Sequence, residues 1–281
     1  MEFSGEIITS AQNKYVSLAR MLDEKKRRDE ASLFRFDGVK LLCESVRRGV
    51  EIEYVLLCEG KVESVFEKAE KTYGIKKEDI ICRAIVVKSS VFEKISQEKS
   101  PEGVITVAKY IDKFHKFVKI NNEGNDFSDF GGERILLLES VRDPQNVGAI
   151  IRSAAALGAD RIIMSSDCAD IYNPKAVRAA MGSLFCMKID RVDSVTDAVR
   201  CLRWCGRRVF AAALNADACV LGKEQIRKSD CVLIGNEGHG LSSEVIDACD
   251  GAIYIPMKMD VESLNASVAA SVLLWEFFGR N

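Results

Sequence analysis

The amino-acid sequence predicts an α/β protein in which short apolar strands alternate with amphipathic helices. The chain has 281 residues, which at roughly 150 residues per domain suggests two domains. Apolar residues make up 47% of it, enough for a sizeable core, and only 4 prolines interrupt it. Apolar runs of strand length recur between stretches of helical periodicity, and this alternation favours α/β over a β-sandwich.

The first block of elements occupies the N-terminal part of the chain. An i, i+3, i+4, i+7 apolar stripe that starts at Tyr15 predicts a helix ending in the basic run at residues 25–28. Strands and helices alternate after it. Strands are expected over residues 33–36, 53–58, 84–87 and 104–108, and helices over residues 39–46 and 62–73.

A change of composition divides the chain. Residues 121–132 (NNEGNDFSDFGG) are rich in Gly, Asn, Asp and Ser and have no apolar period, which is typical of a linker. We therefore expect a first domain over residues 1–118, a linker over residues 119–132 and a second domain over residues 133–281.

The second domain opens with a continuous apolar run over residues 135–141, typical of a strand buried on both faces of a parallel sheet. The last segment, residues 263–278, predicts a helix that is apolar nearly all round and therefore buried on more than one face, inside the fold or across a dimer. Further strands are expected over residues 161–164, 209–214, 231–234 and 252–255.

The net charge of the chain gives little information about its partners. Lys and Arg (40) nearly balance Asp and Glu (42), so the net charge of −2 does not indicate a nucleic-acid partner. The local cluster Lys25, Lys26, Arg27 and Arg28 has two interpretations: an RNA-contacting patch, or a solvated helix end stabilised by the helix dipole.

The 10 cysteines do not form a recognisable framework. None forms a CxxC pair, and many lie in apolar runs, which favours buried thiols in a reducing cytoplasm. Cys201 and Cys205 lack a second ligand pair, so we expect no metal site. The polar start of the chain predicts no signal peptide, and no apolar run approaches the ~18 residues that a membrane span requires.

Polar residues follow three of the second domain's strands, where ligands of open α/β sheets bind. The first such segment is DPQNVGAIIR, residues 143–152. Its Asp and Pro predict a helix start, with Asn146 in the preceding loop and Arg152 on the first turns, both facing one cleft. The alternative is an Asn cap and a solvated Arg.

Two further segments follow strands. GNEGHGL, residues 235–241, has three glycines in six positions, which indicates close backbone approach and suits a ligand bound by backbone groups around Glu237. It matches neither a dinucleotide fingerprint nor a P-loop, and His239 has no evident orienting partner for acid–base work. In the third segment, Ser263 is expected to cap the last helix, with Asn265 close behind it.

NVGAIIR, GNEGHGLS and IPMKMDVESLNASVA, in this order, resemble the three motifs of the SpoU (TrmH) RNA 2′-O-ribose methyltransferases of the SPOUT superfamily. NPKAVRAAMGSLF, residues 173–185, resembles the segment that such enzymes carry between the first two motifs. The likeness covers residues 133–281, and the three motifs together are highly specific. More loosely, the first domain resembles the family's substrate-binding domain, of ribosomal-protein-like α/β fold; Phe36-Asp37-Gly38 stands where a Glu-Gly pair is commoner.

The resemblance implies a deep trefoil knot in the C-terminal parallel-sheet domain, a homodimer, and S-adenosylmethionine wrapped by the second and third motifs without a metal. Cofactor binding then falls mainly on backbone groups of Gly235, Ile255 and Leu264, with Leu214 and Asn215 bordering the adenosyl pocket.

The resemblance also assigns the chemistry. Arg152 matches the family's essential arginine, which is often assigned as the base. Because a guanidinium stays protonated in proteins, it can clamp a phosphate and stabilise oxyanion charge more easily than it can accept a proton. The residues that would orient the ribose and this arginine are Asn146, Glu237, Ser263 and Asn265.

The implied reaction is methyl transfer from S-adenosylmethionine to a ribose 2′-hydroxyl of structured RNA, with ribosomal RNA favoured, in the cytoplasm. The alternatives are a tRNA 2′-O-methyltransferase and a non-catalytic knotted RNA-binding or assembly module. A dinucleotide-dependent dehydrogenase is set aside, because the sequence lacks GxGxxG with a ribose-binding acid downstream.

Overall fold

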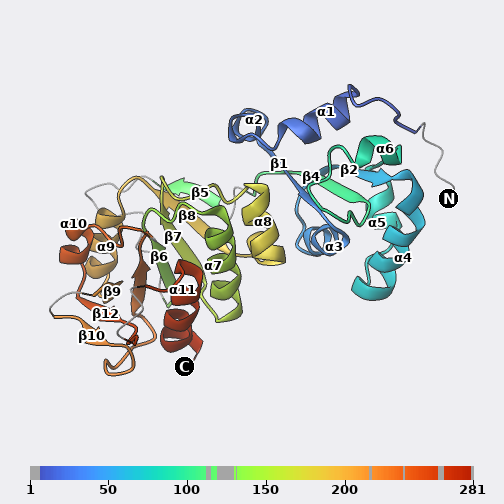
Figure 1. Cartoon of the computed structure of the whole chain (residues 1–281). Helices are drawn as coiled ribbons and strands as arrows, with labels where there is room; N and C mark the ends of the chain where they lie inside the picture. Colours follow the sequence, from blue (N-terminus) through green and yellow to red (C-terminus); the bar gives the residue numbers. More distant parts are fainter. Residues whose placement is uncertain are drawn as a thin grey trace. The chain divides into compact units, whose positions relative to one another are not determined.

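The computed structural model describes residues 7–111, 115–118, 130, 132–214, 217–236, 238–258 and 263–279. Within this part the chain forms two compact units, which Figure 1 shows coloured along the sequence. Unit 1 contains the chain up to Ile111 together with Tyr172–Cys186, and unit 2 contains the rest. In the described segments no helix has the length and apolar character needed to cross a membrane.

Unit 1 is built on a four-stranded sheet in the order β1-β4-β2-β3. β4 runs antiparallel to both of its neighbours, and β2 is parallel to β3. The strands are β1 (Leu33–Asp37), β2 (Ile52–Cys58), β3 (Ala84–Val87) and β4 (Val104–Lys109).

Helices cover both faces of this sheet, because alternate residues of β2 point to opposite sides. Tyr54 and Leu56 pack in the core under α1 (Lys14–Met21) and α6 (Ser89–Phe92), whereas Val55 and Leu57 pack in the core under α3 (Val39–Arg47) and α4 (Val62–Tyr73). The helices of unit 1 that precede β4 are α1 (Lys14–Met21), α2 (Lys25–Ala31), α3 (Val39–Arg47), α4 (Val62–Tyr73), α5 (Glu78–Ile81) and α6 (Ser89–Phe92), with a short 3-10 turn over Glu59–Lys61.

The sequence predicted that the first helix ends in the basic run at residues 25–28, but the structure separates the two. α1 ends at Met21, and the run begins a separate helix, α2, which stops at Ser32 in the left-handed conformation (φ 53°). Cations at a helix N-terminus oppose the helix dipole instead of complementing it. The interpretation of these residues as a dipole-stabilised helix end is therefore wrong.

Unit 2 contains an eight-stranded sheet in the order β10-β12-β9-β11-β6-β7-β8-β5, and every neighbouring pair is parallel. The strands are β5 (His115–Val118), β6 (Ile135–Leu138), β7 (Arg161–Ser165), β8 (Lys188–Val192), β9 (Val209–Ala212), β10 (Cys219–Val220), β11 (Cys231–Ile234) and β12 (Gly251–Tyr254).

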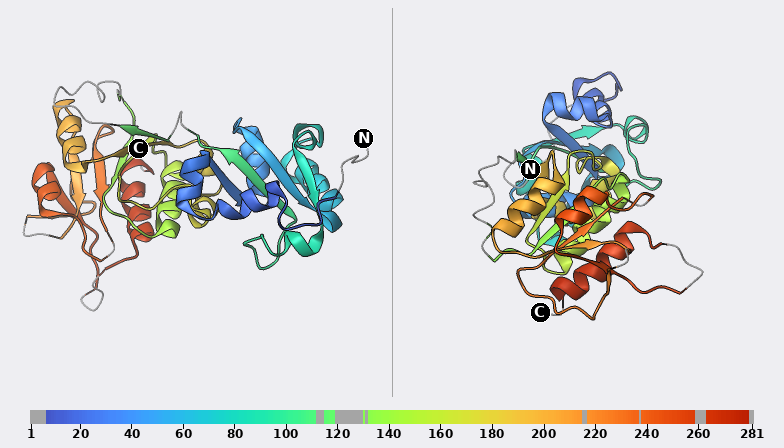
Figure 2. Two further views of the ribbon diagram at one scale, coloured as in Figure 1. Left: turned by 90° about the horizontal axis from the view of Figure 1, so that it is seen from above. Right: turned by 90° about the vertical axis from the view of Figure 1, so that its left-hand side faces the viewer.

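Helices lie on both faces of the second sheet (Figure 2). α9 (Val195–Trp204) and α10 (Ser243–Ala248) cover one face and enclose a large apolar core. α7 (Pro144–Ala156) and α11 (Ala266–Leu274) pack against each other on the other face, and a π-helical turn (Trp275–Gly279) continues α11. Burial on both faces explains the nearly continuous apolar character of β6 and β11.

Three strands of this sheet were not predicted: the two-residue edge strand β10, β8 and β5. β8 reads as polar, yet Asp190 is 1% exposed and forms an ion pair with Arg161, which also pairs with Glu133. Such a buried ion pair conceals the apolar pattern of a central strand. β5 pairs with β8, so residues 115–118 lie in the second sheet, although the expected division assigned them to the first domain.

A segment from the second half of the sequence completes unit 1. This returning segment, Tyr172–Cys186, holds α8 (Pro174–Ala180) and a 3-10 turn (Met181–Phe185). The ring of Tyr172 stacks on Tyr110 with centroids 4.0 Å apart, and its hydroxyl accepts a hydrogen bond from the Ile111 N–H at 2.7 Å. The expected division at residue 133 gave no sign of this, because the contacts join residues more than 60 positions apart.

The Tyr172 hydroxyl yields a stability test. Tyr172→Phe keeps the ring stack but leaves the buried Ile111 N–H without its acceptor, which should lower the free energy of unfolding by about 1–3 kcal/mol. Tyr110→Phe is the matched control, because it removes a hydroxyl that donates to exposed Asp29 at 3.0 Å. Equal urea midpoints for the two variants would contradict this account.

Candidate functional site

A pocket of about 550 Å³ lies at the carboxyl edge of the second sheet. It is formed where the chain leaves β9, β11 and β12, and the side of α11 closes it. Backbone and apolar side chains make up most of its wall, which suits a ligand held by shape and by main-chain groups. The lining includes residues 212–214, 234–236, 238–241, 253–255 and 263–264, together with Met257.

The loop after β11 is tightly folded against itself. Asn236 and Gly240 exchange two backbone hydrogen bonds of 3.0 Å each, and the Asn236 Oδ1 accepts the N–H groups of Gly238 and His239 at 2.8 and 3.1 Å. A Cβ on Gly235 would lie 2.6 Å from the carbonyl carbon and oxygen of Gly240. Glycine is therefore required at position 235, and the backbone of this loop reaches the pocket.

Asn265 joins the starts of two helices. Its Oδ1 caps α11 by accepting the N–H groups of Ser267 and Val268 at 3.0 and 3.4 Å, and its Nδ2 donates to the Asn146 Oδ1 on α7 at 3.0 Å. The predicted cap, Ser263, is exposed and lines the pocket instead. That prediction was wrong because the helix begins at Ala266, two residues later than a Ser263 cap requires.

Asn146 lies in α7, not in the loop before it. Asp143 caps this helix, with its Oδ1 accepting the N–H groups of Gln145 and Asn146 at 2.6 and 3.2 Å, and Pro144 is the first helical residue. Arg152 is exposed on the same helix. Six residues turn a helix by about 240°, so Asn146 and Arg152 project from different sides of α7.

The structure gathers many of the predicted site residues. Of the predicted cofactor-binding residues, Leu214, Gly235, Ile255 and Leu264 line the pocket. Asn215 and Glu237 lie outside the described residues. Among the predicted catalytic residues, Asn146 and Asn265 contact each other and Ser263 lines the pocket, whereas Arg152 stands on the exposed side of α7.

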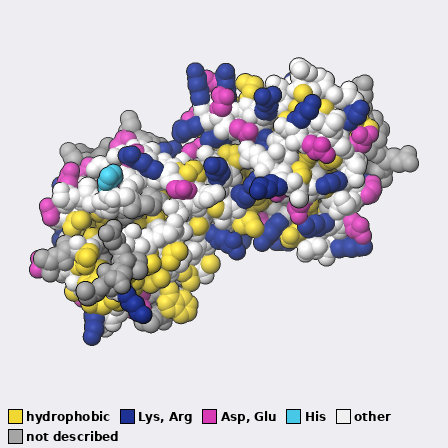
Figure 3. All heavy atoms as spheres, viewed as in Figure 1, with side chains coloured by type: hydrophobic (Ala, Val, Ile, Leu, Met, Phe, Trp, Pro, Cys, Tyr) yellow, Lys and Arg dark blue, Asp and Glu magenta, His cyan; other side chains and the backbone are white. Residues whose placement is uncertain are grey.

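The basic run is largely neutralised by its own helix. Lys25 pairs with Asp29 at 2.5 Å, and Arg27 pairs with Glu30 at 2.9 Å, with Lys26 4.0 Å from the same carboxylate. Figure 3 shows dark blue side chains beside magenta ones over α2. All three cations remain exposed.

Arg28 cannot contact RNA as predicted. It is 1% exposed, and its Nη1 donates to the backbone oxygens of Leu22 and Asp23 at 2.7 and 2.8 Å. This guanidinium closes the turn between α1 and α2, a use that the uniform basic run did not reveal.

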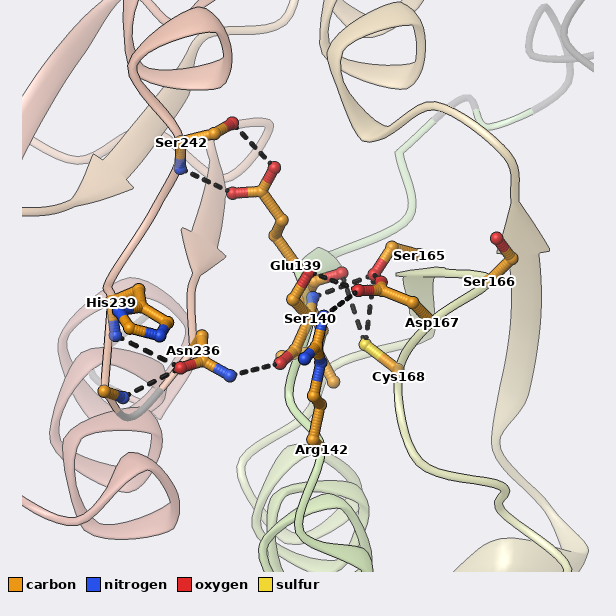
Figure 4. A network of polar contacts seen from close by, with 12 residues as sticks. Glu139, Ser140, Arg142, Ser165, Ser166, Asp167, Cys168, Asn236, His239 and Ser242 are labelled. Atoms are coloured by element: carbon orange, nitrogen blue, oxygen red, sulfur yellow. Dashed lines mark hydrogen bonds and ion pairs between the residues drawn. The ribbon is translucent and has the colours of Figure 1, made fainter.

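Asn236 is a site residue that the sequence reasoning missed. Its side chain caps its own loop and also donates from Nδ2 to the Ser140 carbonyl, at 2.7 Å, in the loop before α7 (Figure 4). The available signal was its position, directly after the first glycine that follows a buried strand. Within the described ranges, no cluster of three or more His, Cys, Asp or Glu side chains could hold a metal ion.

Comparison with known proteins decides the family. Residues 133–275, about half of the chain, match the SpoU rRNA Methylase family, and residues 13–106 match the MRM3-like substrate binding domain. The chain belongs to the SpoU rRNA methylase family. Apart from Tyr172–Cys186, which belongs to unit 1, the SpoU match falls within unit 2, which carries the pocket, and the substrate-binding match falls within unit 1.

Individual SpoU relatives resemble the chain over nearly its full length. The 23S rRNA (guanosine(2553)-2'-O)-methyltransferase RlmP of Bacillus subtilis is 26% identical, covering 97% of this chain and 99% of the relative. The 23S rRNA (uridine(2479)-2'-O)-methyltransferase of Streptomyces viridochromogenes is 31% identical, covering 96% and 90%. The AdoMet-bound rRNA methyltransferase structure from Sinorhizobium meliloti superposes with a TM-score of 0.77 at 29% identity, covering 96% of both chains.

The cap at Asn265 can be tested apart from its second contact. Asn265→Ala removes the cap of α11 and should lower the free energy of unfolding by about 1 kcal/mol. Asn265→Asp keeps the capping oxygen and loses only the donor to Asn146, so its stability should stay near that of the wild type. Thermal unfolding of both variants measures the difference; equal losses would show that the cap contributes nothing.

Proposed function

We propose that the protein transfers a methyl group from S-adenosylmethionine to a ribose 2′-hydroxyl of ribosomal RNA. The observation that carries this proposal is the single pocket edge at which the second and third family motifs meet, with the first motif tied to the third through Asn146 and Asn265. The two curated relatives described above are named as 23S rRNA 2'-O-methyltransferases, and the Sinorhizobium structure contains AdoMet.

The pocket fits such a donor. Its volume of about 550 Å³ is in the range of small-molecule sites, and its walls offer backbone groups and apolar side chains in place of a charged or metal cluster. Gly235 allows the loop after β11 to fold tightly beside the pocket, because a Cβ there would collide with the Gly240 backbone. When bound, S-adenosylmethionine supplies an electrophilic methyl group on a sulfonium. Its holders would be Gly235, Ile255 and Leu264, with Leu214 and Asn215 at the border.

The chain must then position a 2′-hydroxyl and promote the removal of its proton, since a ribose hydroxyl is a weak acid. Arg152 clamps an RNA phosphate and stabilises the developing oxyanion, a role that a protonated guanidinium performs well. Asn146 and Asn265, which are hydrogen-bonded to each other, orient the ribose in this proposal, and Ser263 and Glu237 are proposed for the same task.

A homodimer formed through unit 2 is part of the same proposal. The apolar side chains Val268, Val272 and Trp275 are 49%, 38% and 52% exposed at an i, i+4, i+7 spacing along α11 and the π-helical turn that continues it. Figure 3 shows hydrophobic side chains at the surface over this helix. A stripe of this kind suits a second copy of the chain. The trefoil knot of unit 2 is likewise proposed, supported by the family to which the chain belongs.

Ribosomal RNA is preferred over tRNA because both curated relatives described above are named for 23S rRNA and because unit 1 carries the substrate-binding match. A cytoplasmic location is part of the same proposal, and the ribosomal RNA substrate supports it. Lys25, Lys26 and Arg27 are proposed as exposed phosphate contacts, which would have to exchange their carboxylate partners for phosphates.

Arg152 gives the first functional test. Arg152→Ala should reduce methyl transfer to ribosomal RNA by at least about a hundredfold, because the phosphate clamp and the oxyanion stabilisation are both lost. Cofactor affinity, measured by calorimetry, should change little, since Arg152 does not line the pocket. Arg152→Lys is the control, keeping the charge without the planar fork. Wild-type rates in Arg152→Ala would contradict the role.

The basic run is tested by salt. Replacing Lys25, Lys26 and Arg27 with alanine should weaken RNA binding and flatten the slope of log affinity against log salt by up to about two units, because fewer phosphates are neutralised. Alanine at Asp29 and Glu30 frees the same cations and should strengthen binding. Unchanged slopes in both variants would show that these three cations do not contact RNA phosphates.

A further inference from the structure

Asn236 is a junction between two loops. One side of its amide, Oδ1, accepts two N–H groups of its own loop, and the other side, Nδ2, donates to the Ser140 carbonyl at 2.7 Å. Its own backbone N–H and C=O are paired with Gly240. The side chain is therefore held in one orientation between the loop that lines the pocket and the loop that leads into α7 (Figure 4).

Ser140 is held by its neighbours in a conformation that it would rarely adopt alone. Its φ of 54° places a non-glycine residue in the left-handed region, which costs free energy for any residue that carries a Cβ. Three hydrogen bonds offset this cost. The Ser140 N–H donates to Ser165 Oγ at 2.8 Å, its Oγ donates to Asp167 Oδ2 at 2.7 Å, and its carbonyl accepts from Asn236.

Asp167, two residues after the end of β7, belongs to a third loop in this network. It accepts hydrogen bonds from Ser165 Oγ at 2.6 Å and from Arg142 at 3.2 Å. Burial acts to raise the pKa of Asp167, but the hydrogen bonds from Ser165, Ser140 and Arg142, together with the charge of Arg142, hold that pKa below its ordinary value. The carboxylate thus stays ionised at neutral pH and keeps its acceptor role toward Ser140.

We propose that Asn236 is a positioning residue that couples the cofactor loop to the start of α7, and so makes RNA affinity depend on cofactor occupancy. The inference rests on the proposed function, because it concerns the same pocket. A ligand in the pocket contacts the loop whose Gly238 and His239 N–H groups Asn236 accepts, and Asn236 also holds the Ser140 carbonyl, from which the chain proceeds to Asp143 and α7. α7 carries Asn146 and Arg152, which contact the RNA in the proposed mechanism.

The expected consequence is a coupling free energy between two ligands. RNA should bind about fivefold or more tightly when the pocket holds a cofactor, and the cofactor should bind more tightly by the same factor when RNA is present. In this proposal Asn236 makes no contact with the RNA, whether or not the pocket holds the cofactor. Its effect on catalysis therefore arises through the placement of α7, where a displacement of ~1 Å can cost about a hundredfold in rate.

Two substitutions separate the two halves of the amide. Asn236→Asp keeps an oxygen to accept the N–H groups of Gly238 and His239, but loses the donor and places a carboxylate against the Ser140 carbonyl. Asn236→Ala loses both. Ser242→Ala is the control, since it removes the hydroxyl bond to Glu139 (2.8 Å) that also joins these loops while lying outside the pocket lining.

The experiment measures the affinity for unmodified 23S rRNA transcript with and without saturating S-adenosylhomocysteine, the affinity for S-adenosylhomocysteine alone, and kcat. In Asn236→Asp, S-adenosylhomocysteine should bind within about threefold of wild type, kcat should fall about 10- to 100-fold, and the coupling ratio should approach one. Asn236→Ala should also lose cofactor affinity. Ser242→Ala should keep the wild-type ratio and kcat.

Three results would overturn the proposal. The first is equal RNA affinity of the wild type with and without S-adenosylhomocysteine, and the second is an Asn236→Asp variant with the coupling ratio and kcat of the wild type. The third is a loss of cofactor affinity in Asn236→Asp that by itself accounts for the fall in kcat and in the coupling ratio. Thermal unfolding separates these from a failure to fold, because a purely structural role lowers the melting temperature without changing the ratio. Failure of the proposed function looks different: the wild type would bind both ligands and transfer no methyl group.

Discussion

The pairing of β6 with β11 is the constraint on which the site depends. Their parallel register aligns Leu138 with Ile234, and the Glu139 N–H continues the ladder by donating to the Ile234 carbonyl at 2.9 Å. Two loops that are almost 100 residues apart in sequence therefore leave the sheet side by side. The Asn236–Ser140 hydrogen bond is possible only in this register, because a shift of one residue would turn these side chains to the opposite face.

The sequence predicted the parts of the fold that depend on local pattern. Apolar runs identified β6, β7, β9, β11 and β12, because strands buried on both faces need little else. It did not predict β8, where Asp190 is buried against Arg161, nor the packing of Tyr172 on Tyr110. Both depend on partners distant in sequence, and a periodicity argument has no access to such partners.

The same distinction applies to the site. The sequence indicated which segments reach the pocket, because glycines and polar residues follow buried strands there. It misassigned the details set by hydrogen-bond competition. Asp143 caps α7, so Asn146 is helical; Asn265 caps α11, so Ser263 is available to the pocket. Arg28 was misread because a charged side chain in a basic run gives no sign of being buried.

The reaction itself is tested most directly by nucleoside analysis of ribosomal RNA treated with the protein and S-adenosylmethionine labelled in its methyl group. This account predicts label in a 2′-O-methylnucleoside from 23S rRNA, within an alkali-resistant dinucleotide, since the methylated 2′-oxygen can no longer attack the adjacent phosphate, and little label from tRNA. Label recovered on a base, or in tRNA alone, would contradict it.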